Sequence, residues 1–208
     1  MARSNPEKAV DRLFALYVMD RCRTRHGINT VSETKMQKLV FYVQKRLAEN
    51  RVRAMNYSFI KLLFPTFSTE LRSDLNDLTR LGFLEGQYYE ENDKARMIIE
   101  DFHQVFDGNL EIKRLIDEEV DRYAPIETDD LVKITRQLRW GRKAISELIN
   151  GTPLVYPPKT RIRRTLKISD EDLEDLAICL SPKVAGDMEQ AFDELRRGKR
   201  LTHAEVFG

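Results

Sequence analysis

Histidine, cysteine and clustered carboxylates are the side chains that most often do chemistry in proteins, and in this sequence they are scattered. His26, His103 and His203 each stand alone, without the paired spacing of a metal-binding motif. Cys22 and Cys179 are far apart and also lack metal-ligand spacing. No glycine-rich phosphate loop and no Gly-x-Ser-x-Gly elbow occurs. We therefore expect a protein that is not an enzyme and needs neither a metal nor another cofactor. A triad or metal site that assembles only in three dimensions is the remaining alternative.

The composition is that of a globular chain. A length of 208 residues allows one or two domains, and 41% hydrophobic with 33% charged residues provides a core and a well-solvated surface. The net charge of +1 neither requires nor excludes nucleic acid. No apolar run is long enough to cross a bilayer, the first residues lack the apolar stretch of a signal peptide, and isolated cysteines fit a reducing compartment. We expect a cytoplasmic protein with no membrane partner.

The first half of the chain has the order of elements of a winged helix. Apolar spacing predicts helices over 5–25, 33–49 and 69–81, with Ser32 and Ser68 as caps of the second and third. Between the last two, 56–64 is rich in aromatic and β-branched residues and is typical of a short strand. Gly82 ends the third helix, and 83–102 is expected to form a hairpin whose polar tip is 90–95.

The second half is expected to be helical, followed by a basic linker and a helical arm. Helices are predicted over 108–123 and 128–138, the second continuing to 149 with a break near Gly141. Turn residues and an extended Tyr-Pro-Pro mark the linker. The predicted fold class is mainly α with minor β: a winged-helix-like core over 5–150 with a small hairpin, a linker over 151–168 and a C-terminal helical extension over 169–208.

The third helix corresponds to the helix that reads DNA in a winged helix, and its charges decide whether it can do so. Its cationic and amide residues for base or phosphate contacts are Arg72, Asn76 and Arg80. Beside them stand the acidic residues Glu70, Asp74 and Asp77, and the predicted hairpin tip adds Glu90, Glu91 and Asp93 against Lys94. Because carboxylates repel phosphates, this element is expected to suit DNA poorly.

A better basic cluster lies in the linker. Its arginines are Arg161, Arg163 and Arg164, flanked by Lys159 and Lys167. Such a cluster contacts phosphates or an acidic partner, or is simply a solvated, charged linker.

Several stretches resemble the Panacea domain, also called the SocA-type antitoxin domain. "KMQKLVFYVQ" at 35–44 is similar to the family's Lys-Leu-Gln-Lys-Leu helix, and 59–85 is similar to its aromatic strand, Gly-Pro turn and following helix, with Phe-Pro in place of Gly-Pro. "LVKITRQLRW" at 131–140 is loosely similar to a third motif, in which Thr135 and Trp140 match and Arg136 replaces a histidine. The resemblance covers roughly 9–148. It implies a winged-helix-like antitoxin that neutralises a toxin by direct binding.

The C-terminal arm resembles the toxin-wrapping tails of Phd- and RelB-type antitoxins. An amphipathic helix after a linker can lay its apolar side chains into a groove of a partner, or it can pack on its own domain. The predicted partner-binding residues are Val184, Met188, Phe192, Leu195 and Val206 as apolar anchors and Arg196, Arg197 and Arg200 as steering charges. The sequence therefore predicts an antitoxin-like protein whose partner is a cognate toxin or other protein. The alternative is a winged-helix DNA-binding transcription regulator, for which a homodimer is a further partner.

Overall fold

The computed structural model describes residues 3–63, 65–86, 88–155 and 162–197. The chain is mainly helical with small sheets, as the sequence predicts. The helices are α1 (Asn5–His26), α2 (Glu33–Glu49), α3 (Thr69–Arg80), α4 (Asp93–Asp101), α5 (His103–Asp107), α6 (Leu110–Tyr123), α7 (Thr128–Gln137), the 3₁₀ turn η1 (Ile145–Glu147), α8 (Asp170–Cys179) and α9 (Pro182–Arg196). Within the described ranges, no helix combines the length and the apolar character needed to cross a membrane.

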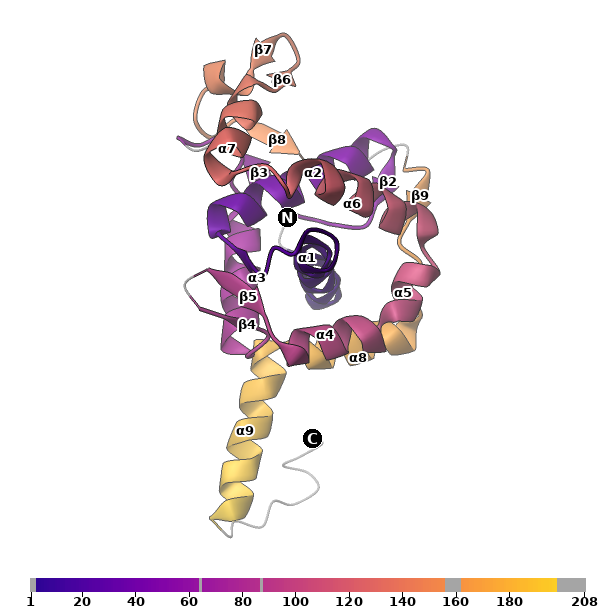
Figure 1. Cartoon of the computed structure of the whole chain (residues 1–208). Coiled ribbons are helices and arrows are strands. Elements are labelled where there is room, and N and C mark those ends of the chain that lie inside the picture. Colours follow the sequence, from indigo (N-terminus) through magenta and orange to yellow (C-terminus); the bar gives the residue numbers. More distant parts are fainter. Residues whose placement is uncertain (1–2, 64, 87, 156–161, 198–208) are drawn as a thin grey trace.

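Helix α1 runs through the centre of the body, with α2, α3, α4, α5, α6 and α8 arranged around it, whereas α9 projects away (Figure 1). Every residue from Ala9 to Asp20 is buried. A stretch with apolar side chains on every face must be covered on all sides, and α1 contacts α3, α4, α6 and α8. The helix begins with a capping box formed by Ser4 and Glu7, and it ends where Gly27 takes the left-handed conformation (φ 66°).

Helices α1, α2 and α3 and the hairpin after them follow the succession expected of a winged helix. The hairpin strands are β4 (Leu84–Glu85) and β5 (Tyr89–Glu91). A further strand, β1 (Thr30–Val31), lies between α1 and α2 and completes an antiparallel sheet of order β1-β5-β4. The sequence gives little sign of β1, because two residues are too few to show strand alternation.

The hairpin is shorter than predicted. Its turn contains Gly86, with φ 79°, and its second strand ends at Glu91. The run after it, expected to be a strand, forms helix α4 because the Asn92 side chain accepts a hydrogen bond from the backbone of Ala95 (3.1 Å) and caps the helix. Ala95, Ile98 and Ile99 then face the core at helical spacing.

Two other segments also differ from expectation. Residues 139–144, expected to continue a helix, form a small hairpin of β6 (Arg139–Trp140) and β7 (Lys143–Ala144) that turns at Gly141 (φ 65°). In the segment 151–168, β8 (Pro153–Val155) pairs with β3 (Phe59–Ile60), and β9 (Arg164–Thr165) pairs with β2 (Val52–Arg53). Both ends of the expected linker are therefore hydrogen-bonded to the body.

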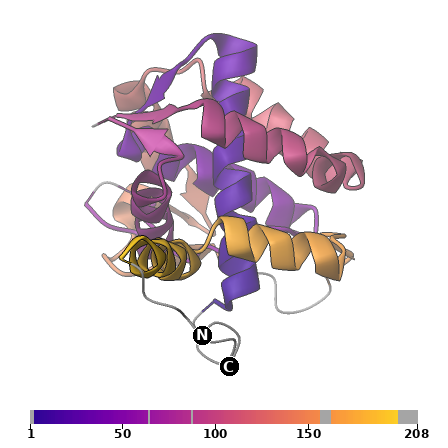
Figure 2. The same cartoon turned by 90° about the horizontal axis from the view of Figure 1, so that it is seen from below.

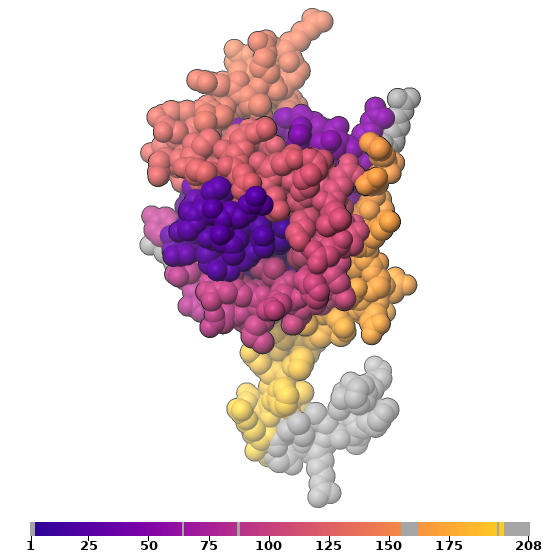
Figure 3. Space-filling view, turned by 45° about the vertical axis from the view of Figure 1, so that its right-hand side comes forward, coloured from indigo at the N-terminus to yellow at the C-terminus, as the bar shows by residue number. Residues whose placement is uncertain are grey.

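The last two helices behave differently from each other. Helix α8 crosses α1 (Figure 2), and Leu176 and Leu180 are fully buried in the same hydrophobic core. Helix α9 begins after Ser181 and extends away from the body (Figures 1 and 3). The part of the arm that projects thus starts at Pro182, whereas residues 170–180 belong to the packed body.

Candidate interaction surfaces

The projecting helix α9 carries large apolar side chains in solvent. Met188 is 51% exposed and Phe192 is 58% exposed, and Val184, one turn earlier on the same face, is half-buried. In a soluble protein an isolated exposed apolar side chain is ordinary, but a row on one face of a free-standing helix is typical of a partner-binding surface. We refer to Val184, Met188 and Phe192 as the arm face.

The predicted steering charges lie at the far end of this helix. Arg196 and Arg197 are exposed, and the nearest carboxylate to the Arg196 guanidinium is that of Asp193, at 4.0 Å. Such a long surface pair holds its charges weakly, so both arginines stay available to a partner. Arg200, Val206 and the side chain of Leu195 lie outside the part of the chain that can be described.

The base of α9 is fixed to the body. Arg12 of α1 is buried, and its Nη1 donates a hydrogen bond of 2.5 Å to the backbone carbonyl of Leu180, the last capping residue of α8. The Ser181 hydroxyl then accepts a hydrogen bond from the backbone of Val184 at the start of α9 (3.4 Å). The arm face is therefore presented on a helix whose first turn is capped by Ser181, directly after a residue that is held by the core.

The outward face of α3 is polar and carries no fully exposed acid. Leu71, Leu75 and Leu78 face inward and are buried. The exposed residues of the helix are Thr69, Arg72, Ser73, Asn76, Thr79 and Arg80, which include the three cationic and amide residues expected there. Arg72 lies 4.6 Å from the ring centroid of Phe67 and 2.6 Å from a carboxylate oxygen of Glu33.

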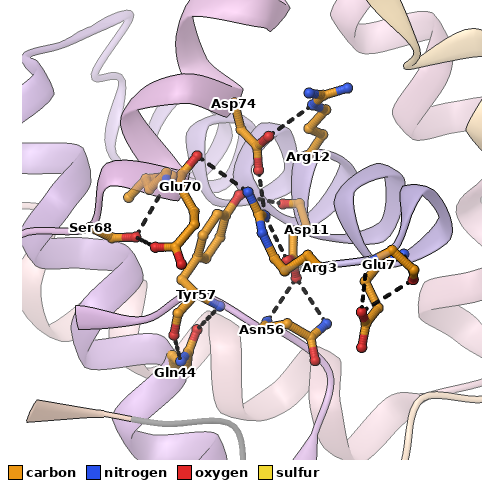
Figure 4. A network of polar contacts seen from close by, with 12 residues as sticks. Arg3, Glu7, Asp11, Arg12, Gln44, Asn56, Tyr57, Ser68, Glu70 and Asp74 are labelled. Carbon is orange, nitrogen blue, oxygen red and sulfur yellow. Dashed lines mark hydrogen bonds and ion pairs between the residues drawn. The ribbon is translucent and has the colours of Figure 1, made fainter. Parts of the chain in front are cut away.

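The prediction that Asp74 and Asp77 crowd this outward face is wrong. Asp74 is 1% exposed, and its two carboxylate oxygens accept hydrogen bonds from Arg3 (2.6 Å) and from Arg12 Nε (3.0 Å) (Figure 4). Asp77 also pairs with Arg12. Asp74 lies on the apolar stripe, three residues after Leu71, so the charge points at α1 and is neutralised there.

The expected acidic hairpin tip is also different. Glu91 is 4% exposed and Asp93 belongs to the first turn of α4, so neither lies at the turn. Glu85 and Glu90 are exposed on the short strands, and the Lys94 ammonium donates to the carbonyl of Leu81 (2.7 Å). The sequence of the hairpin, 83–91, contains no lysine or arginine, so the wing has no positive charge of its own for a phosphate backbone.

The buried ion cluster around Asp74 connects α1, α3 and the segment before β3. Asp11 accepts hydrogen bonds from Arg3 (2.8 Å) and from the backbone of Asn56 (2.8 Å). Burial raises the pKa of Asp11 to about 7, although the hydrogen bond and the charge of Arg3 oppose this rise. Arg3 also lies over the ring of Tyr57, so the cluster is covered by an aromatic side chain.

Two glutamines of α2 hold extended segments against that helix. The Gln37 side chain donates to the carbonyl of Ser68 (3.0 Å) and accepts from its backbone N–H (2.8 Å). Two helical turns later, Gln44 makes the same pair of bonds to the backbone of Tyr57. Beside Gln37, Lys38 donates to the carbonyl of Thr66 (3.0 Å), a residue with the left-handed φ of 66°. The pKa of Lys38 is lowered to about 8, chiefly by burial and then by the charge of Arg136.

Among the described residues of the basic linker cluster, one arginine side chain is engaged by the body. Arg164 forms an ion pair with Glu111, and the backbone of Arg163 donates to Arg51 (2.8 Å). The Arg163 side chain is exposed, and Arg161 lies outside the described residues. Arg163, Arg164 and Lys167 border a cavity of about 550 Å³ that Asp107 and Glu111 also line, so the positive charge there is partly balanced.

The described residues contain no group of three or more histidine, cysteine or acidic side chains placed to hold a metal ion. Cys22 is buried and Cys179 is exposed, and neither is in a disulfide. His26 lies 3.1 Å from Asp121, and His103 contacts the carbonyl of Glu100, while His203 is not among the described residues.

Comparison with protein-family models, with curated proteins and with solved structures found no match.

Proposed function

We propose that this chain is a binding protein of the antitoxin type, which captures a partner protein through the arm face of α9 and masks the surface that the partner needs for its activity. The observation that carries the proposal is the exposure of Met188 and Phe192 on a helix that stands away from the body. The resemblance of 35–44 and of the C-terminal arm to antitoxin sequences supports the same function.

The energetics favour such a role for α9. Burying one large apolar side chain contributes about 1.5–3 kcal/mol, so Met188 and Phe192 together supply about 3–6 kcal/mol when a groove covers them. Since the first turn of α9 is already held by Ser181 and by the core contacts of Leu180, less ordering entropy opposes binding. Arg196 and Arg197 would then steer acidic groups of the partner toward the end of the helix.

The test is co-expression with the product of the neighbouring reading frame of the same operon. The full chain should restore growth when that product is toxic, and should be recovered with it in a complex. Phe192→Asp and Met188→Asp should abolish rescue and weaken binding by at least about tenfold. Met97→Asp is the matched control, because Met97 is also exposed (63%) but lies on α4. Rescue by the Phe192→Asp variant at the level of the unmodified chain would overturn the proposal.

A truncated chain that lacks the arm is a second test of the proposal, and the structure shows at which residue that chain should end. Ending the chain after Lys167 removes α8, and with it Leu176 and Leu180 of the core, so loss of binding would report unfolding. Ending it after Ser181 removes the arm and leaves the core residues in place. The chain that ends after Ser181 should fail to bind the partner while keeping its folded body.

The second candidate function, DNA binding through α3, gains from the inward position of Asp74 and Asp77. With these carboxylates paired to Arg12, the outward face offers Arg72, Asn76 and Arg80 to a duplex. A gel shift at low salt tests it. Arg72→Ala with Arg80→Ala should remove binding if α3 is the reader, and Arg161→Ala with Arg163→Ala should do so if the basic segment is. If the chain does not retard a DNA duplex in the gel at low salt, DNA binding through α3 and DNA binding through the basic segment are both excluded.

A further inference from the structure

A cavity of about 580 Å³ lies where the end of α1, the start of α2 and the start of α7 come together beside the hairpin. Its walls carry hydrogen-bonding side chains from each of these elements, among them His26, Ser32, Thr128 and Tyr88. A volume of this size is in the range of small-molecule sites. The cavity is remote from α9, so nothing proposed above accounts for it.

Lys35 is the residue that distinguishes this cavity. It lines the wall and is 9% exposed, yet its ammonium makes no hydrogen bond and no ion pair with any of the described residues. Only its backbone N–H is engaged, by the Ser32 hydroxyl (3.2 Å). The neighbouring Lys38, by contrast, donates to the carbonyl of Thr66. The side chain is largely covered, but its Nζ is not among the buried polar atoms that lack a partner, so the ammonium reaches the open space of the cavity and is available to an anionic group.

The surroundings of Lys35 supply further donors for the same anion. Ser32 and Lys35 belong to the first turn of α2, where backbone N–H groups and the helix dipole favour negative charge. Thr30 adds a hydroxyl on the same side. The acid in this turn, Glu33, is engaged by Arg72 (2.6 Å), so it competes little for Lys35.

Another part of the lining has a different character. Glu127, just before α7, is the acidic residue that lines the cavity. Its carboxylate favours hydroxyl or amino donors over an anion. Tyr88, which is 59% exposed, presents an aromatic side chain to the same cavity, and aromatic rings stack well on planar groups such as nucleobases.

We propose that this cavity binds a small phosphorylated molecule of about the size of a mononucleotide. The phosphoryl group accepts hydrogen bonds from the Lys35 ammonium and from the hydroxyl groups of Ser32 and Thr30. A planar ring packs against Tyr88, and hydroxyl groups of the ligand donate to Glu127. The proposal also explains why the first lysine of the "KMQK" stretch is present: Gln37 and Lys38 hold the 65–68 turn, and Lys35 makes no structural contact of this kind.

The experiment is a titration of the isotope-labelled full chain followed by amide NMR. The probes are inorganic phosphate, the four ribonucleoside monophosphates, the corresponding nucleosides and a single-stranded oligonucleotide. At least one monophosphate should bind at millimolar concentration or better and shift the amides of Glu33 to Lys35 and of Tyr88, and its nucleoside should bind at least about tenfold more weakly.

Lys35→Met should weaken this binding by about tenfold or more, while Lys45→Met should leave it unchanged. Lys45 is the matched control, since it lies on the same helix and pairs only with Glu49 at the surface. If Lys35→Met does not fold, the titration of the unmodified chain still decides: absence of binding by every monophosphate overturns the proposal. So does equal binding of nucleoside and monophosphate, binding of the oligonucleotide alone, or a response to inorganic phosphate confined to residues away from the cavity.

Discussion

Arg12 of α1 and Asp74 of α3 form a buried ion pair, with Nε and Oδ1 3.0 Å apart. The same guanidinium pairs with Asp77 and donates to the carbonyl of Leu180. One side chain of the central helix therefore fixes both the helix that would face DNA and the end of α8 from which the arm extends. This relationship turns the acids of α3 inward and holds the base of α9.

Replacing Arg12 should destabilise the fold strongly. Arg12→Met leaves the Leu180 carbonyl without its donor and Asp74 with Arg3 alone, and breaking a buried ion pair on one side costs about 3–5 kcal/mol. Urea denaturation measures the free energy of unfolding. Arg80→Met, which removes only an exposed pair with Asp77, should cost about 0.5 kcal/mol or less. Similar costs for the two variants would show that the cluster does not stabilise the fold.

Glu91 should make stability depend on pH near neutrality. Neither of its carboxylate oxygens has a hydrogen-bond partner, and its pKa is raised to about 7, first by burial and then by the charge of Asp20, against the opposing charges of Arg23 and Arg96. A carboxyl group with a raised folded-state pKa stabilises the fold at pH values below its unfolded pKa and loses that contribution as the pH rises through about 7.

The substitution Glu91→Gln removes this titration. The free energy of unfolding of the unmodified chain should fall between pH 5 and pH 8 by an amount on the order of 2 kcal/mol, and its melting temperature should fall with it. The melting temperature of Glu91→Gln should fall by less. Thermal melts of both proteins across this range provide the comparison. Parallel curves would mean that Glu91 stays ionised throughout.

Gln37 should be essential to the turn at 65–68. Gln37→Leu has a similar volume but leaves the buried N–H of Ser68 without a partner, while the Ser68 carbonyl keeps only its hydrogen bond from the backbone of Arg72. This costs about 1–3 kcal/mol. Gln137→Leu is the control, since Gln137 is exposed at the end of α7. Hydrogen exchange of the α3 amides should accelerate in Gln37→Leu alone. If the exchange rates of the α3 amides are the same in Gln37→Leu as in the unmodified chain, residues other than Gln37 stabilise this turn.

Removing α8 should damage the core, and removing α9 should not. A chain ending after Lys167 loses the buried Leu176 and Leu180, so its melting temperature should drop by about 10–20 °C. A chain ending after Ser181 should melt within a few degrees of the full chain. Differential scanning calorimetry of both truncations makes the comparison, and equal melting temperatures would contradict the assignment of α8 to the body.

The features that sequence alone could predict are those set by local chemistry. Ser32 and Ser68 cap helices as expected, because capping needs only neighbours in the chain. The inward orientation of Asp74 could also be predicted from the sequence, because Asp74 stands three residues after Leu71 and four before Leu78, on the apolar stripe. Its partner Arg12, however, lies 62 residues away, and no local pattern identifies it.

The remaining differences come from tertiary context. The run that became α4 is equally apolar as a strand or a helix, and the Asn92 cap decided between them. The expected linker is engaged at β8 and β9 by strands more than ninety residues earlier in the chain, a pairing that the composition of the linker does not reveal. The Lys35 cavity could not be foreseen, because it needs α1, α2 and α7 to meet.

Partner capture by the arm face is measured most directly by calorimetric titration of the purified chain with the protein encoded beside it. The unmodified chain and Met97→Asp should bind that protein with the same affinity, and Phe192→Asp should bind at least about tenfold more weakly while melting at the same temperature. Equal affinity of all three proteins would contradict the role of α9.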